Sequence, residues 1–284
     1  MPPSSLANPP SASLQVETLE NRCLPSTATY VTSLYANLLH RAGSAAEVAG
    51  WTAAINAGQS PLAVAAAFTN SQEYRTNLIN TDYQVLLGRT PAPAELAGWL
   101  AQLQGGANGF QIEAAFLGSP EFFAKHGNDT KVFLNTVYHE VLNRPVDAGG
   151  LATWSQQLQA GVSREEVALG ILDSNEALTR FVTAAHQDLL LRLPDPGGLA
   201  GFVADLQAGL SPSLLLAKIA SSAEFIALEG GLDVVPVPVP VVVPTPVDTF
   251  FDPFLFGGLG FGFGCCGFTG GFTGGFTGGG TGTF

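Results

Sequence analysis

The sequence predicts an all-α protein built from four tandem helical repeats of about 48–55 residues. The first observation is a register of aromatic residues, in which Trp51, Trp99, Trp154 and Phe202 follow one another at intervals of 48, 55 and 48 residues. The second is an Arg ten residues before each of them, and the third is a helical spacing of apolar residues inside every repeat. Self-similarity at a fixed period is the sequence signature of repeat proteins.

Four side-chain positions, which we call the repeat landmarks, recur in the same order. A Tyr or His precedes the Arg by six residues, the Trp or Phe follows it by ten, and the Glu of a Ser-x-Glu sequence follows it by 32. The landmarks are Tyr35, Arg41, Trp51, Glu73, Tyr83, Arg89, Trp99, Glu121, Tyr138, Arg144, Trp154, Glu176, His186, Arg192, Phe202 and Glu224.

The first two helices of each repeat follow from apolar spacing and from helix stops. Leu34, Leu38 and Leu39 stand at i, i+4 and i+5, which places them on one helix face before the Arg. The next segment carries the Trp or Phe and ends at a Gly, which tolerates the left-handed conformation just past a helix. These glycines are Gly58, Gly106, Gly161 and Gly209. The Trp series is expected to be largely buried as core.

The third and fourth helices begin at polar caps. The third is expected to start at Ser60, Asn108, Ser163 and Ser211, all good N-cap residues, and the Ser of Ser-x-Glu caps the fourth. No breaker separates the fourth helix from the next first helix in repeats one and three, so residues 72–87 and 175–191 are expected to be single helices. The middle interval has seven extra residues around positions 126–129, which predicts a longer hinge there.

Composition divides the chain into five segments. We expect a disordered N-terminal segment (1–28), repeats one and two (29–127), repeats three and four (128–230), a Pro/Val-rich linker (231–249) and a Gly/Phe-rich low-complexity tail (250–284). Cys23, Cys265 and Cys266 lie outside the repeats, so no disulfide framework is expected in the body. The tail cysteines could cross-link chains, carry a lipid or remain free thiols.

Charge and hydropathy narrow the partners. With 23 acidic against 11 basic residues the net charge is −12, which argues against nucleic acid. Residues 254–272 are uncharged and long enough to span a bilayer, but eight of the nineteen are Gly, so membrane insertion is not expected. Residues 1–25 lack the basic start and apolar run of an ordinary signal peptide.

The strings 83–99 and 138–154 resemble the bacterial repeat family DUF4214, whose consensus has a Tyr, a Leu-Leu-Gly-Arg-x-Pro, a Gly-Leu-x-x-Trp and a closing Ser-x-Glu-Phe. The resemblance covers about residues 29–229, and the family is similar to the helical linker domains of phycobilisomes. It implies parts of exported or surface proteins with no assigned activity. Repeat one lacks the Pro after Arg41, and repeat four has His186 and Phe202 for Tyr and Trp, so these two are expected to be end caps.

No catalytic, metal or cofactor site is predicted. Glu165 and Glu166 are the only adjacent pair of carboxylates, and they fit the first turn of a helix after Ser163. The histidines share no spacing that would let two of them bind one metal ion; they are His40, His126, His139 and His186.

The sequence therefore favours a noncatalytic structural or interaction protein, a surface scaffold or adhesion module whose partner is a protein or cell-envelope component. Its tail could self-associate. The alternative is a carbohydrate-binding accessory domain of an extracellular enzyme system, with the Trp series stacking on sugar rings. We also predict that each landmark Arg pairs with the Glu 32 residues later, because a cation suits a helix C-terminus and a carboxylate suits an N-terminus. The alternative is that each residue serves only its own helix.

Overall fold

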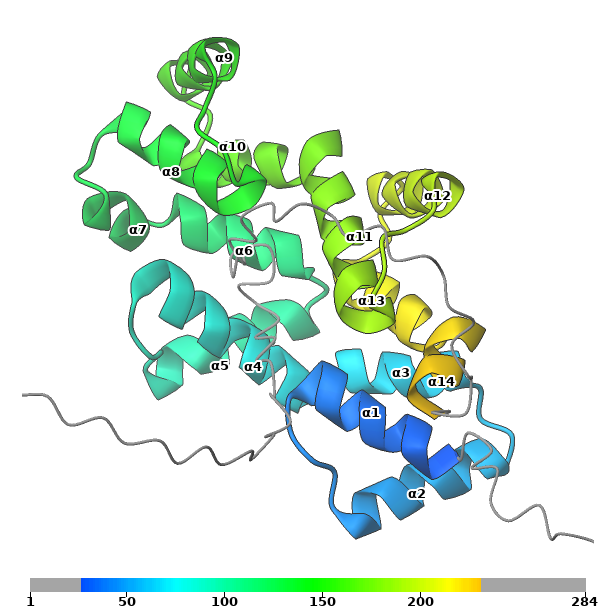
Figure 1. Ribbon diagram of the computed structural model, residues 1–284. Helices are drawn as coiled ribbons and strands as arrows, with labels where there is room; N and C mark the ends of the chain where they lie inside the picture. The colour runs from blue at the N-terminus through cyan, green and yellow to red at the C-terminus, as the bar shows by residue number, and fades with distance from the viewer. Residues whose placement is uncertain (1–26, 231–284) are drawn as a thin grey trace, which may run out of the picture.

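A computed structural model gives the fold of residues 27–230 (Figure 1). The predictions about the N-terminal segment, the Pro/Val-rich linker, the Gly/Phe-rich tail and the three cysteines concern chain outside these described residues. Along residues 27–230 all regular structure is helical and no strand occurs. The predicted all-α class is confirmed.

The helices follow the expected order in each repeat. The first repeat contains α1 (Thr27–Leu39), α2 (Ala45–Asn56), α3 (Pro61–Thr69) and α4 (Gln72–Asp82). The second contains the π-helix η1 (Tyr83–Leu87), α5 (Pro93–Gln104), α6 (Gly109–Gly118) and α7 (Pro120–Lys125). The third contains α8 (Thr130–Leu142), α9 (Ala148–Gln159), α10 (Arg164–Leu172) and α11 (Asn175–Leu190), and the fourth contains α12 (Pro196–Gln207), α13 (Pro212–Ala220) and α14 (Ala223–Gly230).

Helix ends lie where the sequence signals place them. The side chain of Ser163 accepts a hydrogen bond from the amide of Glu166, which bonds back in a capping box at the start of α10. The corresponding residues Ser60, Asn108 and Ser211 cap α3, α6 and α13 in the same way with their side chains. After α2, Gly58 has a φ of 103°, a left-handed conformation that costs Gly little.

Two of the connections between repeats are continuous helices, as expected. α11 runs without interruption from Asn175 to Leu190. α4 passes directly into η1, so residues 72–87 are helical throughout, although the last turn is a π-turn that ends at Gly88. The middle connection is broken: α7 ends at Lys125 and α8 begins at Thr130, because the extra residues form a turn with Gly127 and Asn128 at positive φ.

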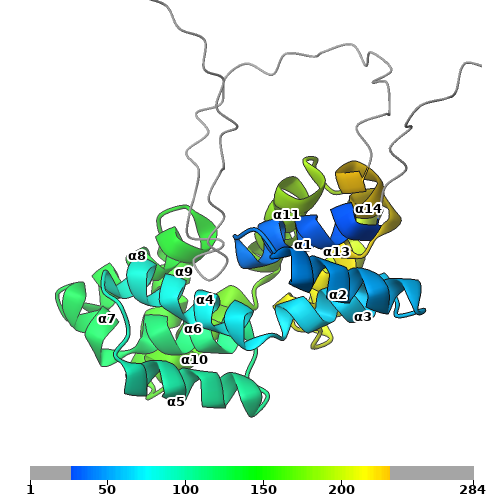
Figure 2. The same cartoon turned by 90° about the horizontal axis from the view of Figure 1, so that it is seen from below.

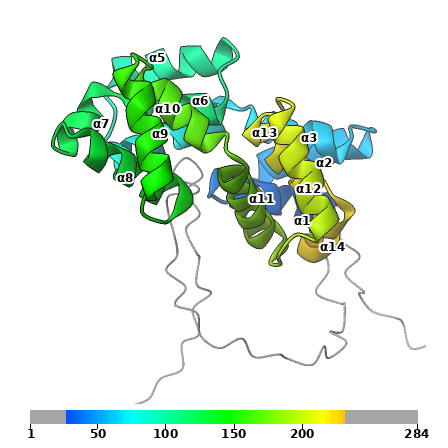
Figure 3. The same ribbon diagram turned by 90° about the horizontal axis from the view of Figure 1, so that it is seen from above.

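The third helices of the repeats form the centre of two apolar cores. α6 packs against α10 and α3 packs against α13. One core combines buried residues of repeats two and three, including Phe116, Phe133 and Ile171. The other combines repeats one and four, including Leu34 and Phe225. Figures 2 and 3 show the two groups of helices side by side, with α4 and α11 leading from one to the other.

The first and last repeats are not caps at opposite ends of an open array, as the sequence suggested. They pack on each other: α1 contacts α14, and the rings of Tyr30 and Phe225 meet edge to face with centroids 6.2 Å apart. Both rings are buried. The physical reason is that each terminal repeat has one apolar face without a neighbour along the chain, and joining these faces buries both.

Candidate functional site

The landmark residues meet at one place in each repeat, where the end of the first helix faces the start of the fourth. In repeat three, Arg144 Nε and Nη2 donate to the two carboxylate oxygens of Glu176 at 2.7 and 2.8 Å. This is the bidentate geometry that guanidinium and carboxylate groups favour. The same two-point pairing joins Arg41 to Glu73, Arg89 to Glu121 and Arg192 to Glu224. The predicted pairing is therefore present in all four repeats.

A second carboxylate joins the Arg in three repeats, and the sequence analysis missed it. Arg89 Nη1 and Nη2 donate to Glu95 at 2.9 and 2.8 Å, and Glu95 also accepts from the amide of Ala92 at the start of α5. Glu47 does the same beside Arg41, and Asp147 accepts from Arg144 at 3.1 Å. One guanidinium thus connects the ends of three helices. The signal was weak because the partner stands six residues after the Arg in two repeats but three in the other.

An aromatic pair completes the arrangement. The Arg89 guanidinium lies over the ring of Tyr83 at 4.7 Å, a cation–π contact, and the Tyr83 hydroxyl accepts a hydrogen bond from Trp99 Nε1 at 3.0 Å. Tyr138 makes the equivalent contacts with Arg144 at 5.1 Å and with Trp154 at 2.9 Å. We call this set of Arg, carboxylates, Tyr and Trp the repeat lock.

The landmark aromatics are less buried than the sequence predicted. Trp51, Trp99, Trp154 and Phe202 occupy equivalent places, but all four are half-buried. Trp99 stacks on Phe116 with ring centroids 4.6 Å apart, so one face packs on the core while part of the ring remains accessible. The reason is that the second helix of each repeat lies at the periphery; α2 and α9 have no fully buried residue.

The lock of repeat four is reduced. His186 takes the place of the Tyr; its Nδ1 lies 2.8 Å from the carbonyl oxygen of Val182, and its ring meets Phe202 edge to face. Phe202 has no N–H to donate. Arg192 keeps its pairing with Glu224, while Asp195 caps α12 by accepting from Gly198. His186 is buried, as expected for a residue that substitutes for a core Tyr.

Hydrogen bonds from the Arg stabilise the ionised carboxylates of the locks. They lower the pKa of Glu47 and of Glu95 to about 2, and capping amides contribute in both cases. The hydrogen bond from Arg144 likewise lowers the pKa of Glu176. At neutral pH the lock therefore holds paired charges and no group that titrates near 7, so it has no general acid or base of matched pKa.

A second polar cluster lies between the two cores and was not foreseen. Asp82 on α4 is 2% exposed, and its Oδ2 accepts no hydrogen bond from the described residues. Burial and the neighbouring Glu113 raise the pKa of Asp82 well above its usual value, and burial together with Glu140 raises the pKa of Glu113 to about 8. From sequence these residues resemble ordinary surface carboxylates on helices.

Two further searches of the described residues gave negative results. Between residues 27 and 230, no three His, Cys, Asp or Glu side chains are grouped so that they could hold a metal ion. In the same part of the chain, no helix has both the length and the apolar character needed to cross a membrane.

Fold and locks together define an all-α repeat protein whose repeats are each closed by a buttressed Arg–carboxylate pair. Residues 14–78, 75–125 and 113–181 match the family described as a domain of unknown function, DUF4214. These segments cover more than half of the sequence, and the chain belongs to this family. The matched residues end at 181, and the fourth repeat continues the same helix order and Arg–Glu pair beyond them. No curated protein and no solved structure matches the chain significantly.

Proposed function

We propose that this protein is a noncatalytic scaffold or adhesion module, in which the helical repeats form a rigid body that holds a partner. The observation that carries this proposal is the use of the recurring polar side chains. In repeats one and two, all three guanidinium nitrogens of the Arg donate to carboxylates of the same repeat. Residues that recur in every repeat therefore serve its own closure, as expected where shape is the function.

The electrostatics support the same proposal. A catalytic acid or base works best with a pKa near the operating pH, whereas the lock carboxylates have lowered pKa values. The raised values at Asp82 and Glu113 belong to groups held between two apolar cores. Such positions suit internal packing better than access by a substrate.

The location and the partner are part of the proposal. By family resemblance we place the protein at the cell surface or outside the cell, with a protein or cell-envelope component as its partner. The low content of basic residues argues against nucleic acid, and the Phe-rich tail supplies apolar side chains for self-association.

Fractionation and genetic complementation of the producing cells test this function. We expect the chain in the envelope or external fraction, and we expect cells that lack it to lose attachment to surfaces or to one another. Glu165→Gln, which alters one member of the adjacent acidic pair, should restore attachment as well as the wild type does. A cytosolic location, or complementation lost with this variant while its amount and fold are unchanged, would contradict the proposal.

The second candidate is a carbohydrate-binding domain, and one observation favours it: Trp51, Trp99 and Trp154 are half-buried rather than buried. Accessible indole faces can stack on sugar rings. Titration with oligosaccharides decides between the candidates. Saturable quenching of Trp fluorescence that is lost in Trp99→Phe would support carbohydrate binding, and unchanged emission would support the scaffold.

A further inference from the structure

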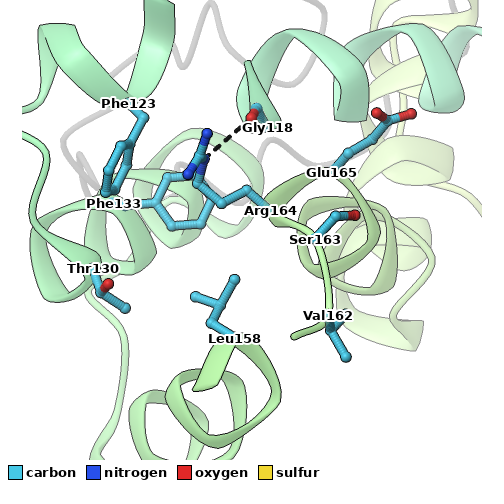
Figure 4. A pocket seen from close by; sticks show the side chains of 9 residues that line it. All are labelled: Gly118, Phe123, Thr130, Phe133, Leu158, Val162, Ser163, Arg164 and Glu165. Atoms are coloured by element: carbon cyan, nitrogen blue, oxygen red, sulfur yellow. Dashed lines mark hydrogen bonds between the residues drawn. The ribbon is translucent and has the colours of Figure 1, made fainter. Parts of the chain in front are cut away.

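A pocket of about 410 Å³ lies where the middle hinge separates α7 from α8, close to the start of α10 (Figure 4). Its apolar wall includes Phe133 from α8 and Leu158 from α9, which face each other across the space in Figure 4. Its polar groups are the hydroxyl of Thr130 and the guanidinium of Arg164. Volume and lining are those of a small-molecule site, in which few polar groups converge on an apolar space.

The pocket exists because repeat three departs from the pattern of the others. In repeats one and three the fourth helix continues into the next repeat, but α7 and α8 are separated by the turn at residues 126–129. The first residue of the third helix is Pro61, Gly109 or Pro212 in the other repeats, and Arg164 in repeat three. The lengthened hinge and the Arg therefore occur together, at the same place.

Arg164 is held in position by groups other than a carboxylate. Its Nε donates to the carbonyl oxygen of Gly118 at 3.2 Å, and its guanidinium carbon lies 4.3 Å from the centre of the Phe123 ring. Among the described residues no carboxylate pairs with it, and its two terminal nitrogens have no hydrogen-bond partner there. In Figure 4 the carboxylate of Glu165 points away from the guanidinium.

This arrangement is a preorganised cation in a chain with a net charge of −12. The ring of Phe123 and the carbonyl of Gly118 fix the guanidinium, so little side-chain entropy remains to be lost when an anion binds. The free terminal nitrogens form the edge that accepts a carboxylate in bidentate fashion. The apolar wall opposite would cover a hydrocarbon body but not a second charge.

We propose that this pocket binds a small organic monocarboxylate with an aromatic or short aliphatic body. The carboxylate lies against the terminal nitrogens of Arg164, within reach of the Thr130 hydroxyl, and the apolar body lies between Phe133 and Leu158. This binding site goes beyond the scaffold function and does not depend on it.

Phenylacetate and its neutral analogue phenylacetamide, titrated into the full chain, test the proposal. We expect saturable binding of phenylacetate with a Kd of about 5 mM or tighter, and binding of phenylacetamide at least about tenfold weaker, because it lacks the charge. Amide resonances of Gly118 and Thr130 should shift with phenylacetate. Equal binding of the two probes, no saturation up to about 50 mM, or shifts confined to other residues would overturn the proposal.

Two variants and one control place the site. Arg164→Gln should weaken phenylacetate binding at least about tenfold, whereas Arg75→Gln, which changes another Arg without an ion pair among the described residues, should bind as the wild type does. If Arg164→Gln loses its helical circular dichroism, Leu158→Trp, which fills the pocket from the opposite wall, gives the answer. Wild-type affinity in folded Arg164→Gln, or in Leu158→Trp, would mean that the probe binds elsewhere.

Discussion

Breaking the ion pair between Arg144 and Glu176 should destabilise the protein by more than the two residues contribute separately. The pair joins the end of α8 to the start of α11, and both side chains are partly exposed, at 37% and 45%. Replacing each residue by Gln removes the charges while keeping side chains of similar length. The quantity of interest is the interaction free energy, which is the part of the double mutant's loss that the two single losses do not explain.

The structure sets the size of this interaction. An exposed ion pair contributes about 0.2–1 kcal/mol, because water and salt screen it. The bidentate geometry at 2.7 and 2.8 Å and the support of Arg144 by the Tyr138 ring place this pair at the upper end of that range or slightly above it. We therefore expect a coupling of about 0.7–1.5 kcal/mol at low ionic strength.

Urea denaturation of the wild type, both single variants and the double variant measures the coupling, and repeating the cycle at about 1 M salt should reduce it. As a control, Arg144→Gln combined with Glu121→Gln should give no coupling, because Glu121 pairs with Arg89. Losses from Arg144 and Glu176 that add within about 0.3 kcal/mol would refute the reasoning, since the two groups would then not interact.

Three further changes give predictions that stability measurements can check. Leu191 is 74% exposed with a φ of 54°, so Leu191→Asn should stabilise the protein by about 0.5–1 kcal/mol in urea melts, and a loss would contradict the cost assigned to this conformation. A Cβ on Gly118 would lie 2.4 Å from the Glu165 nitrogen, so Gly118→Ala should lower the melting temperature, whereas Gly98→Ala, in open space, should not. Because burial raises the pKa of Glu113 from 4.5 to about 8, the folded state holds a proton that the unfolded state releases, and the unfolding free energy should fall between these pH values; Glu113→Gln should flatten that part of the profile, and an unchanged profile would assign the effect elsewhere.

Repeats made the sequence informative about the locks. A single Arg and a single Glu 32 residues apart would have suggested nothing, but four such pairs in one register require a common cause. Helix ends were predictable because caps such as Ser163 and stops such as Gly58 act through their own backbone neighbours. The capping carboxylates were missed because their offset from the Arg differs between repeats.

Properties that depend on distant helices could not be read from the sequence. Helical spacing indicates that Trp99 faces inward, but its exposure depends on how far α5 lies from the core, which local spacing does not determine. The contact between α1 and α14 joins segments at opposite ends of the repeat region. Asp82 and Glu113 resemble surface residues because nothing in their neighbours shows that a second core covers them.

The shared core of the first and fourth repeats is tested most directly by nuclear Overhauser contacts between the rings of Tyr30 and Phe225 in the full chain. Their centroids are 6.2 Å apart in an edge-to-face arrangement, so ring protons should give cross-peaks. These cross-peaks should be present at neutral pH together with contacts between Tyr35 and Phe68, whose centroids are 4.7 Å apart within repeat one. If the contacts within repeat one are seen but those between Tyr30 and Phe225 are absent, the repeats form an open array and the closed body described above is wrong.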